Sequence, residues 1–378
     1  MAGIYIHIPF CKTRCIYCGF FSSTLLEWKE RYVDAICKEL EMRTDYLGGE
    51  EINTIYFGGG TPSQLSAEQI SMVLQHISKN YSVSPKAEIT LEVNPDDVSD
   101  SFLSSLKQLT RVNRISMGIQ TFNDDRLRFL NRRHNAQQAI EAVKLLKQNG
   151  FSNISIDLMF GFPNQTLEEW GKDIEKAIDM NVQHISAYSL MYEEDTSLGS
   201  MLQKGEVEEI SDELSSEMYK NLMDKLEKAG FIHYEISNFA KPNFHSRHNS
   251  SYWNGTKYLG IGATAHSYDG DTRQWNIDNI QKYCQAIESG KIECEKEVLT
   301  EKQKYNEYIM TRLRTSEGIN LKDLEERFGT TMSETLRDYA RDLIHSDLLT
   351  FSYSRDFMKL TKEGIYLSNQ VMSTLFIE

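Results

Sequence analysis

Strand-like and helix-like segments alternate through the first half of this 378-residue chain, and this alternation limits the possible folds more than any other feature. Six short runs rich in Ile, Val, Tyr and Thr are predicted to be strands, at residues 4–8, 54–57, 88–93, 112–117, 154–160 and 184–190. Helical periodicity takes over between them, as in the apolar face formed by Val33, Ile36, Cys37 and Leu40. Strand-then-helix units imply parallel strands joined by right-handed crossovers. Because six units are too few for a closed eight-unit barrel, the sequence predicts an α/β fold with an open, partial (β/α)6 barrel, and a doubly wound sheet is the alternative.

Polar or glycine-rich groups follow five of these predicted strands. They are a cysteine-rich loop after the first strand, then Gly58-Gly-Gly-Thr-Pro62, Glu92-Val-Asn-Pro95, Gly118-Ile-Gln120, and Asp157 with Gly161-Phe-Pro163. In parallel α/β folds the chemistry gathers at the carboxyl ends of the strands. The sequence therefore predicts one site to which five strand ends contribute.

The cysteine-rich loop holds Cys11, Cys15 and Cys18, which are half of the six cysteines, within eight residues. Thiolates this close in sequence can hold one soft metal centre. A closed structural zinc site needs four ligands, whereas an iron–sulfur cube held by three cysteines leaves one iron free for a small molecule. His7 could complete a zinc site, so zinc is the alternative to an iron–sulfur cluster.

The bulk composition limits the partners of the chain. A formal net charge of −14 argues against a dominant nucleic-acid or anionic-membrane surface. No apolar run reaches membrane-spanning length, so we expect at most peripheral membrane contact. The scattered Cys37, Cys284 and Cys294 suit a reducing compartment, and their own roles stay open. We expect a cytoplasmic protein.

The second half of the chain departs from the strand–helix alternation, and we expect three domains at residues 1–195, 196–298 and 299–378. The middle region contains a dense polar and aromatic segment, residues 244–253. The last region reads as a helix around Tyr308, a helix stopped by Gly329, a further amphipathic helix, and two short strands around Ser354-Arg-Asp356. That order predicts a winged-helix-like module, which we expect to serve as an accessory or partner-docking unit. The predicted fold is thus a partial barrel with a C-terminal α+β extension and this module.

The spacing C-x-x-x-C-x-x-C after a strand and Pro9 resembles the signature of the radical S-adenosylmethionine (SAM) superfamily. The resemblance implies a partial (β/α)6 barrel in which Cys11, Cys15 and Cys18 bind a [4Fe–4S] cluster. It implies that the open iron takes the amino and carboxylate groups of SAM. It also implies that Gly59, Gly60 and Thr61 hold the SAM amino group.

Several longer stretches resemble a narrower family, the oxygen-independent coproporphyrinogen III oxidase group and its relatives. The stretches are Tyr5-Ile-His-Ile-Pro-Phe-Cys11, Glu92-Val-Asn-Pro95, Ser116-Met-Gly-Ile-Gln-Thr-Phe122, Asn131-Arg-Arg-His134 and Ile156-Asp-Leu-Met-Phe-Gly-Phe-Pro163. The resemblance implies SAM contacts from Glu92, Gln120, Arg132 and Asp157. It also implies that Tyr5 and Tyr17 line the cluster and SAM.

Two features separate this chain from the oxidases of that group. Phe20 stands where they carry a further cysteine, and His248-Asn-Ser-Ser-Tyr-Trp253 resembles the H-N-x-x-Y-W motif of the heme-chaperone subgroup, HemW. The resemblance implies that heme is bound by His248, Asn249, Tyr252 and Trp253. An imidazole beside two aromatic rings suits heme. Composition alone favours a packed loop in which His248 is hydrogen-bonded and Trp253 is part of the core, and the motif match reverses that preference.

The predicted function is therefore that of a radical SAM protein that binds heme and transfers it to an acceptor hemoprotein, with an electron donor as a further partner. His245 and His266 stay open as other iron ligands. Two alternatives remain: a coproporphyrinogen III oxidase, and a non-catalytic iron–sulfur or zinc protein. The sequence leaves open the acceptor, the electron donor, the oligomeric state, whether SAM is cleaved, and whether heme is bound covalently.

Overall fold

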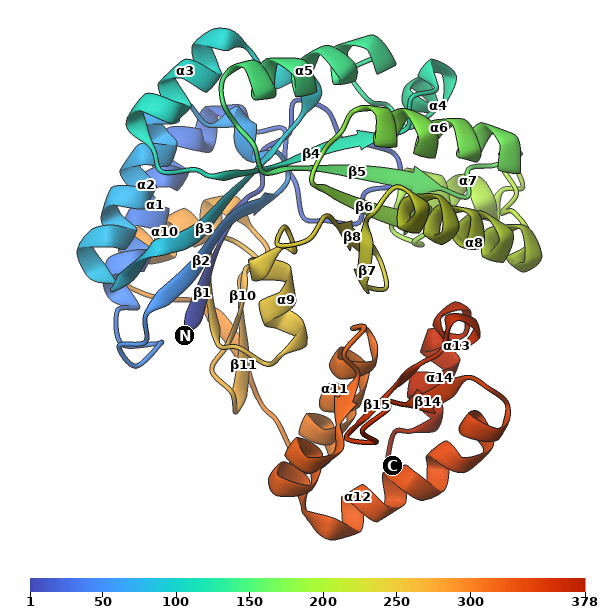
Figure 1. Cartoon of the computed structure of the whole chain (residues 1–378). Coiled ribbons are helices and arrows are strands. Elements are labelled where there is room, and N and C mark those ends of the chain that lie inside the picture. Colours follow the sequence, from blue (N-terminus) through green and yellow to red (C-terminus); the bar gives the residue numbers. More distant parts are fainter. Residues whose placement is uncertain (378) are drawn as a thin grey trace.

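The computed structural model describes residues 1–377, in which helices cover the outer side of one twelve-stranded mixed sheet (Figure 1). Six strands run parallel in chain order: β1 (Ala2–Ile8), β2 (Ile52–Gly59), β3 (Val83–Val93), β4 (Arg114–Gln120), β5 (Ile154–Phe160) and β6 (His184–Ser189). This arrangement confirms the predicted α/β fold with an open parallel sheet.

The fourth strand lies later in the chain than predicted, at 114–120 rather than 112–117. Val112 is buried although it precedes the strand, which explains the misplaced prediction. Asn113 uses its side chain to pair with β3, because its Oδ1 accepts from Ile89 N (2.9 Å) and its Nδ2 donates to Ala87 O (2.8 Å). The regular ladder therefore begins only at Arg114.

Helices follow the strands and pack on their outer side. They are α1 (Lys29–Met42), α2 (Ala67–Asn80), α3 (Asp100–Leu109), α4 (Asp124–Phe129), α5 (Ala136–Gln148) and α6 (Leu167–Asp179), with short 3-10 turns at Leu26–Trp28, Pro62–Gln64 and Pro95–Asp97. The start of α2 is fixed by a capping box in which Ser66 and Gln69 satisfy each other's backbone N–H groups. Along β1, Ile4, Ile6 and Ile8 are fully buried in the main core, so the alternate residues Tyr5 and His7 face the interior of the barrel.

Additional strands extend the sheet at both edges. β9 (Tyr258–Ile261) pairs parallel with β1, and β10 (His266–Tyr268), β11 (Thr272–Asn276) and β12 (Cys294–Val298) continue antiparallel. At the other edge, β8 (Asn238–Ala240) and β7 (Ile232–Glu235) follow β6. Within residues 1–377 the strand order runs from β12 to β7 without closing, so the barrel is open on one side.

Four helices belong to these extensions: α7 (Ser197–Gln203), α8 (Asp212–Lys228), α9 (Arg247–Trp253) and α10 (Ile280–Glu288). The helix α9 differs from the others because it packs inside the barrel, at the amino ends of the strands. Its backbone N–H groups at Arg247 and His248 donate to the Glu88 carboxylate of β3, at 3.1 and 3.0 Å. This helix therefore closes the amino-terminal end of the barrel interior.

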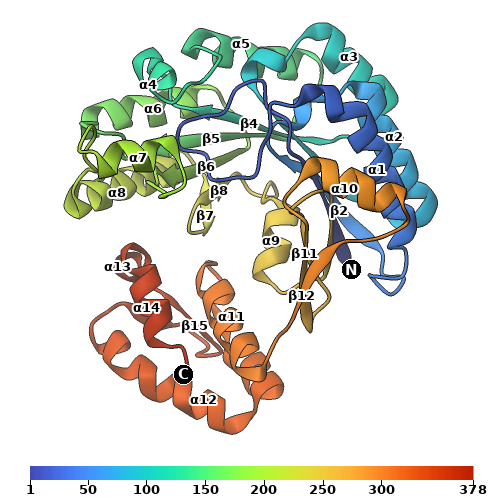
Figure 2. The same cartoon turned by 180° about the vertical axis from the view of Figure 1, so that it is seen from behind.

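The C-terminal module has its own hydrophobic core and a small antiparallel sheet (Figures 1 and 2). Its elements are α11 (Glu301–Leu313), β13 (Ile319–Asn320), α12 (Leu321–His345), β14 (Leu349–Phe351), β15 (Phe357–Leu360), α13 (Lys362–Tyr366) and α14 (Ser368–Thr374). Gly329, predicted to end a helix, is the non-helical residue (φ 83°, ψ 169°) at a kink between two helical parts of α12. The helix around Tyr308, the two helical parts on either side of Gly329 and the two strands flanking residues 354–356 are in the predicted order.

The C-terminal module touches both edges of the open barrel. Arg273 of β11 forms an ion pair with Glu307 of α11 (Nη2 to Oε2, 2.9 Å). At the opposite edge, Ile236 N donates to Arg314 O (3.0 Å), just after α11. The module therefore spans the open side of the sheet.

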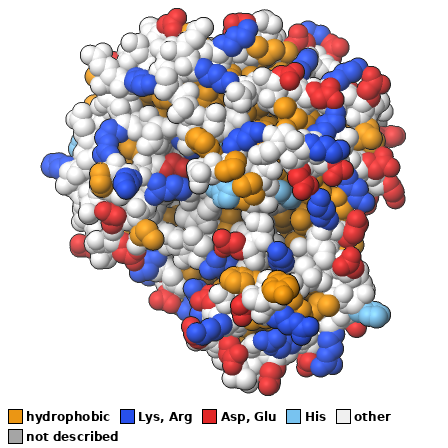
Figure 3. All heavy atoms as spheres, viewed as in Figure 1, with side chains coloured by type: hydrophobic (Ala, Val, Ile, Leu, Met, Phe, Trp, Pro, Cys, Tyr) orange, Lys and Arg blue, Asp and Glu red, His pale blue; other side chains and the backbone are white. Residues whose placement is uncertain are grey.

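The surface carries both signs of charge, interspersed over the face seen in Figure 3. Across residues 1–377, no helix combines the length and apolar character needed to cross a bilayer.

Candidate functional site

A cavity of about 560 Å³ lies at the carboxyl ends of the parallel strands. Most of the residues predicted to bind the cluster and SAM line it: Cys11, Cys15, Tyr17, Cys18, Gly59, Gly60, Thr61, Glu92, Gln120, Arg132 and Asp157. These residues come from the ends of five strands and from the connections after them. The fold thus brings together groups that lie as far as 146 positions apart in the chain, from Cys11 to Asp157.

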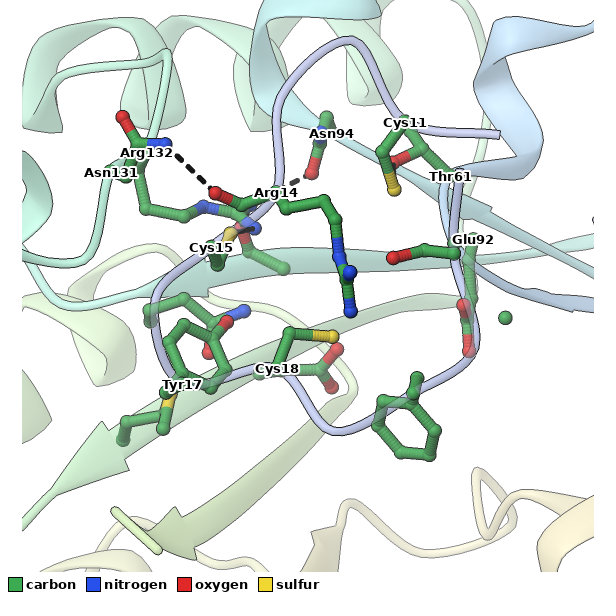
Figure 4. Close-up of a pocket in the computed structure, with 18 of the residues that line it drawn as sticks. Cys11, Arg14, Cys15, Tyr17, Cys18, Thr61, Glu92, Asn94, Asn131 and Arg132 are labelled. Atoms are coloured by element: carbon green, nitrogen blue, oxygen red, sulfur yellow. Dashed lines mark hydrogen bonds between the residues drawn. The ribbon is translucent and has the colours of Figure 1, made fainter. Parts of the chain in front are cut away.

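The cysteine loop is held at its base by backbone hydrogen bonds between Cys11 N and Ser23 O (2.9 Å) and between Ser23 N and Pro9 O (2.7 Å). Figure 4 shows Cys11, Cys15 and Cys18 spaced around the loop, with the side chain of Arg14 crossing the space between them. Burial raises the pKa of the Cys11 and Cys18 thiols. Thiolates at these positions therefore need a cationic partner, which a metal cluster supplies.

The arrangement of possible ligands does not favour the zinc alternative. Within the described part of the chain, no three His, Cys, Asp or Glu side chains are grouped as ligands of one ion. His7 has both ring nitrogens engaged, with Tyr5 Oη (3.1 Å) and Phe21 O (3.1 Å). A four-iron cube does not require convergence on one atom, because each thiolate binds a different iron. The three cysteines thus fit a cluster better than a zinc ion.

The turn after β2 lies tightly against the base of the cysteine loop. A Cβ atom on Gly59 (φ +110°) would lie 2.5 Å from His7 Cε1, and one on Gly60 would lie 2.7 Å from the Pro9 carbonyl carbon. Only glycine fits at these two positions. Thr61 follows directly, and its Oγ1 is 3.3 Å from Cys11 Sγ. Backbone and hydroxyl groups of this turn therefore lie beside the first cysteine.

The guanidinium of Arg132 lies beside the second cysteine. Its Nη2 donates to Asn94 Oδ1 (2.7 Å) and to Gly118 O (2.6 Å), and its Nη1 is 3.5 Å from Cys15 Sγ. Its Nε is buried without a hydrogen-bond partner. A buried guanidinium with an unused donor at a cavity wall is suited to an anionic ligand group such as a carboxylate.

Two carboxyl groups at the cavity floor have strongly altered acidity. Burial raises the pKa of Glu92 to about 7 and that of Asp157 to about 6. Tyr56 Oη donates to Glu92 Oε1 (2.7 Å), and the nearby charge of Arg114 acts in the opposite direction to burial on both pKa values. Arg114 itself is 1% exposed, and its Nε and Nη1 have no partner. A cation bound in the cavity would favour the ionised form of both carboxyl groups.

The two predicted tyrosines take different positions. Tyr17 lines the cavity, and Figure 4 shows it on the cysteine loop between Cys15 and Cys18. Tyr5 lies within the barrel, where its ring stacks on Tyr56 (6.1 Å between centroids), and it is not part of the cavity lining. Tyr5 therefore reaches the cavity only through its neighbours.

The segment predicted to bind heme forms α9, at the opposite end of the barrel interior from the cavity. His248 is 1% exposed, and its ring nitrogens lie 2.8 Å from Thr54 Oγ1 and 2.9 Å from Tyr252 Oη. Burial lowers its pKa to about 3, so the imidazole is neutral. Asn249 is half-buried, and the ring of Trp253 lies under the guanidinium of Arg314 (4.8 Å). The imidazole of His248 is therefore packed and hydrogen-bonded on both nitrogens, whereas Trp253 Nε1 is buried without a hydrogen-bond partner.

Several residues at the site were not singled out from the sequence. Tyr56 contacts both ends of the barrel interior, because its ring stacks on His248 (5.1 Å) and its hydroxyl binds Glu92. Strand alternation could have identified it, since Thr54, Tyr56 and Gly58 share one face of β2. Two exposed apolar residues, Met191 (63%) and Tyr188 (42%), line the mouth of the cavity together with Phe20 (71%), which the sequence had singled out. No local pattern distinguishes such residues from core residues.

Comparison with known proteins assigns the family. Residues 5–177 match the radical SAM superfamily, and residues 299–367 match the HemN C-terminal domain. A Bacillus subtilis (strain 168) protein named heme chaperone HemW is 35% identical over 381 residues, which cover 100% of both chains. A protein of the same name from Lactococcus lactis subsp. lactis is 34% identical over 376 residues, or 99% of this chain and 97% of the relative. This chain belongs to the radical SAM superfamily and is HemW-like.

A solved structure also shares the fold of this HemW-like chain. It is the coproporphyrinogen III oxidase (HemN) of Escherichia coli, described as a radical SAM enzyme. The TM-score is 0.84 at 22% identity, and the match covers 99% of this chain and 90% of the oxidase. At this identity the likeness establishes the fold alone. Membership of the superfamily implies a [4Fe–4S] cluster and SAM.

Proposed function

We propose that this HemW-like chain is a heme chaperone, which binds heme and transfers it to an acceptor hemoprotein. The observation that carries the proposal is Phe20, which is 71% exposed at the cavity mouth. The oxidases that this chain resembles carry a further cysteine at that position. The relatives named heme chaperone match 99–100% of this chain. An exposed aromatic ring at the mouth suits a flat apolar ligand.

The cavity is proposed to hold the cluster and SAM. Cys11, Cys15 and Cys18 would bind three irons, and the turn of Gly59, Gly60 and Thr61 would receive the amino group of SAM. When bound and reduced, the cluster can pass an electron to SAM, which requires an electron donor. The protein itself supplies the binding environment and excludes water from the cavity floor.

The remaining cavity residues fit the anionic and the cationic parts of SAM. Arg132 has a buried, unpartnered Nε that suits the SAM carboxylate. Glu92 and Asp157, both half-buried, suit its sulfonium cation, its amino N–H groups or its ribose hydroxyl groups. Gln120 has a positive φ of 71°, and Tyr17 adds an aromatic surface to the same cavity. Tyr5 would act through Tyr56 rather than by touching SAM.

The heme-binding part of the proposal rests on the names of the relatives and on the motif His248-Asn-Ser-Ser-Tyr-Trp253. The packing of α9 limits how that motif can act. If His248 bound iron, it would have to give up its contacts with Thr54 and Tyr252 and leave a fully buried position. We therefore propose that His248, Asn249, Tyr252 and Trp253 support the heme site through the packing of α9 and do not bind the iron.

The test is an anaerobic reconstitution followed by titration with hemin. We expect four irons bound per chain, a stoichiometric Soret band, and transfer of that band to an apo-hemoprotein mixed with the loaded chain. Absence of heme binding in the intact reconstituted protein would contradict the proposal. Formation of protoporphyrinogen from coproporphyrinogen III would favour the oxidase alternative over the chaperone function. A stoichiometric zinc ion in place of iron would also contradict the proposed iron–sulfur cluster.

A further inference from the structure

We infer that heme binds on the inner face of β10 and β11, with the imidazole of His266 as the iron ligand. This inference rests on the proposed heme-chaperone function and assigns its site. It places the heme beside the cysteine loop rather than at the motif on α9.

Accessibility distinguishes His266 from most other histidines of the chain. The chain has nine, all within the described residues: His7, His134, His184 and His248 are buried, His76, His233 and His245 are half-buried, and His266 and His345 are exposed. A ligand that must accept heme and later release it has to be reachable from solvent. Among the described residues, the two exposed histidines meet this requirement best.

The ring of His266 is also free to bind a metal. In the described part of the chain no group forms a hydrogen bond with either of its nitrogens, and the residue as a whole is exposed. The ring stacks on Trp275, its cross-strand partner, with 5.7 Å between centroids and 25° between planes. The indole therefore orients the imidazole and leaves its nitrogens available. A neutral imidazole nitrogen is a standard axial ligand of heme iron.

The strand register shows which side of the sheet His266 occupies. Tyr268 lies two residues further on and so shares its face, and the Tyr268 ring contacts Tyr258 (6.2 Å). Tyr258 in turn meets Tyr252 of α9 edge to face (4.8 Å). Because α9 lies inside the barrel, this face of β10 is its inner face. His266 is thus on the inner wall of the open side of the barrel.

His266 is close to the cysteine loop as well. A Cβ atom on Gly260 of β9 would lie 2.1 Å from His266 O, and Gly260 pairs with Tyr5, two residues before His7 on β1. His7 Nε2 lies 3.1 Å from Phe21 O, three residues after Cys18. A porphyrin bound through His266 would therefore lie beside the exposed Phe20 at the cavity mouth. By contrast, His345 ends α12 in the C-terminal module.

The experiment uses the full-length, reconstituted protein, which is titrated with hemin and then reduced under CO. In His266→Ala we expect at least a tenfold weaker heme affinity and a shifted Soret band. Added imidazole should restore the band position, because it replaces the missing ligand. His345→Ala is the matched control and should behave like the wild type. Iron content, SAM binding and thermal unfolding should be unchanged in both variants, since both residues are exposed.

The outcomes separate this inference from the proposed function. If the wild type binds heme and His266→Ala keeps the same affinity and spectrum, the site is wrong and the chaperone function stands. If a folded His248→Ala variant loses the Soret band and recovers it with imidazole, the ligand lies on α9. If the wild type itself binds no heme, the proposed chaperone function is wrong, and the inferred heme site is wrong with it.

Discussion

The two ends of the barrel interior are both rich in polar and aromatic side chains, but only one end is open. At the carboxyl end, a cavity of about 560 Å³ contains Arg132 with an unpartnered Nε and Glu92 with a pKa raised to about 7. At the amino end, α9 fills the interior, and both nitrogens of His248 have hydrogen-bond partners. Polar composition therefore does not by itself mark a ligand site. Unsatisfied hydrogen-bonding groups beside open space mark it better.

The two ends are connected through one residue. Tyr56 stacks on His248 and donates a hydrogen bond to Glu92, so the packing of α9 supports the floor of the cavity. Substitutions at the open end should therefore affect binding, whereas those at the closed end should mainly affect stability.

The largest expected effect is loss of the cluster in Cys15→Ala. Removing one of three thiolates should abolish stable binding of four irons, because the remaining two ligands cannot hold the cube. Iron and sulfide analysis after anaerobic reconstitution measures this. The matched control is Cys294→Ala, an exposed cysteine on β12 outside the cavity, which should keep the full iron content. A Cys15→Ala protein that retains four irons would show that the loop does not hold the cluster.

At the closed end, His248→Ala should lower the free energy of unfolding by about 2–3 kcal/mol. The substitution leaves a cavity and removes the partners of Thr54 and Tyr252. Urea unfolding at fixed pH measures the change. His345→Ala, at an exposed position, should stay within about 0.5 kcal/mol of the wild type. Equal stability of the two variants would mean that α9 is not the closing element described above.

The affinity for SAM should rise by about tenfold between pH 5.5 and pH 8. The pKa of Glu92 is raised to about 7 and that of Asp157 to about 6, so both are largely neutral at the lower pH. As the pH rises through these values, the carboxylates ionise and attract the cationic groups of SAM. Equilibrium binding at several pH values on the reconstituted protein measures the profile.

The Glu92→Gln variant should flatten this pH profile. Asp173→Asn is the matched control, because burial also raises the pKa of Asp173 to about 6, but that residue binds Thr121 and Phe122 outside the cavity. In this control variant, the SAM affinity should rise with pH as steeply as in the wild type. A pH-independent affinity in the wild type would show that neither cavity carboxyl group titrates on binding.

The smallest expected effect is on stability at the cavity mouth. Phe20 is 71% exposed, so Phe20→Ala should change the free energy of unfolding by less than about 0.5 kcal/mol. Phe10, at the start of the same loop, is fully buried, and Phe10→Ala should cost about 3–5 kcal/mol. Thermal or urea unfolding of both variants makes the comparison. A large loss of stability in Phe20→Ala would mean that its ring packs within the protein rather than at a free surface.

The sequence by itself determined the parallel sheet and the location of the cavity. Strand and helix periodicities are local, and parallel connections bring all the strand ends to one edge. These local patterns were sufficient to predict that Cys11, Glu92 and Asp157 share one site. It placed β4 two residues too early, because Val112 is apolar and buried although it lies outside the ladder.

Only the tertiary structure decided which of the remaining candidates face open space. His248 and His266 are similar in the sequence, since each lies in a short segment with aromatic and polar neighbours. One is buried by contacts with Thr54 and Glu88, which precede it by more than 150 residues, whereas the other stands on an open strand with free ring nitrogens. Contacts between residues so far apart in the chain produce no recognisable pattern in the sequence around either histidine. The tertiary structure was therefore needed to show which of these two histidines faces solvent.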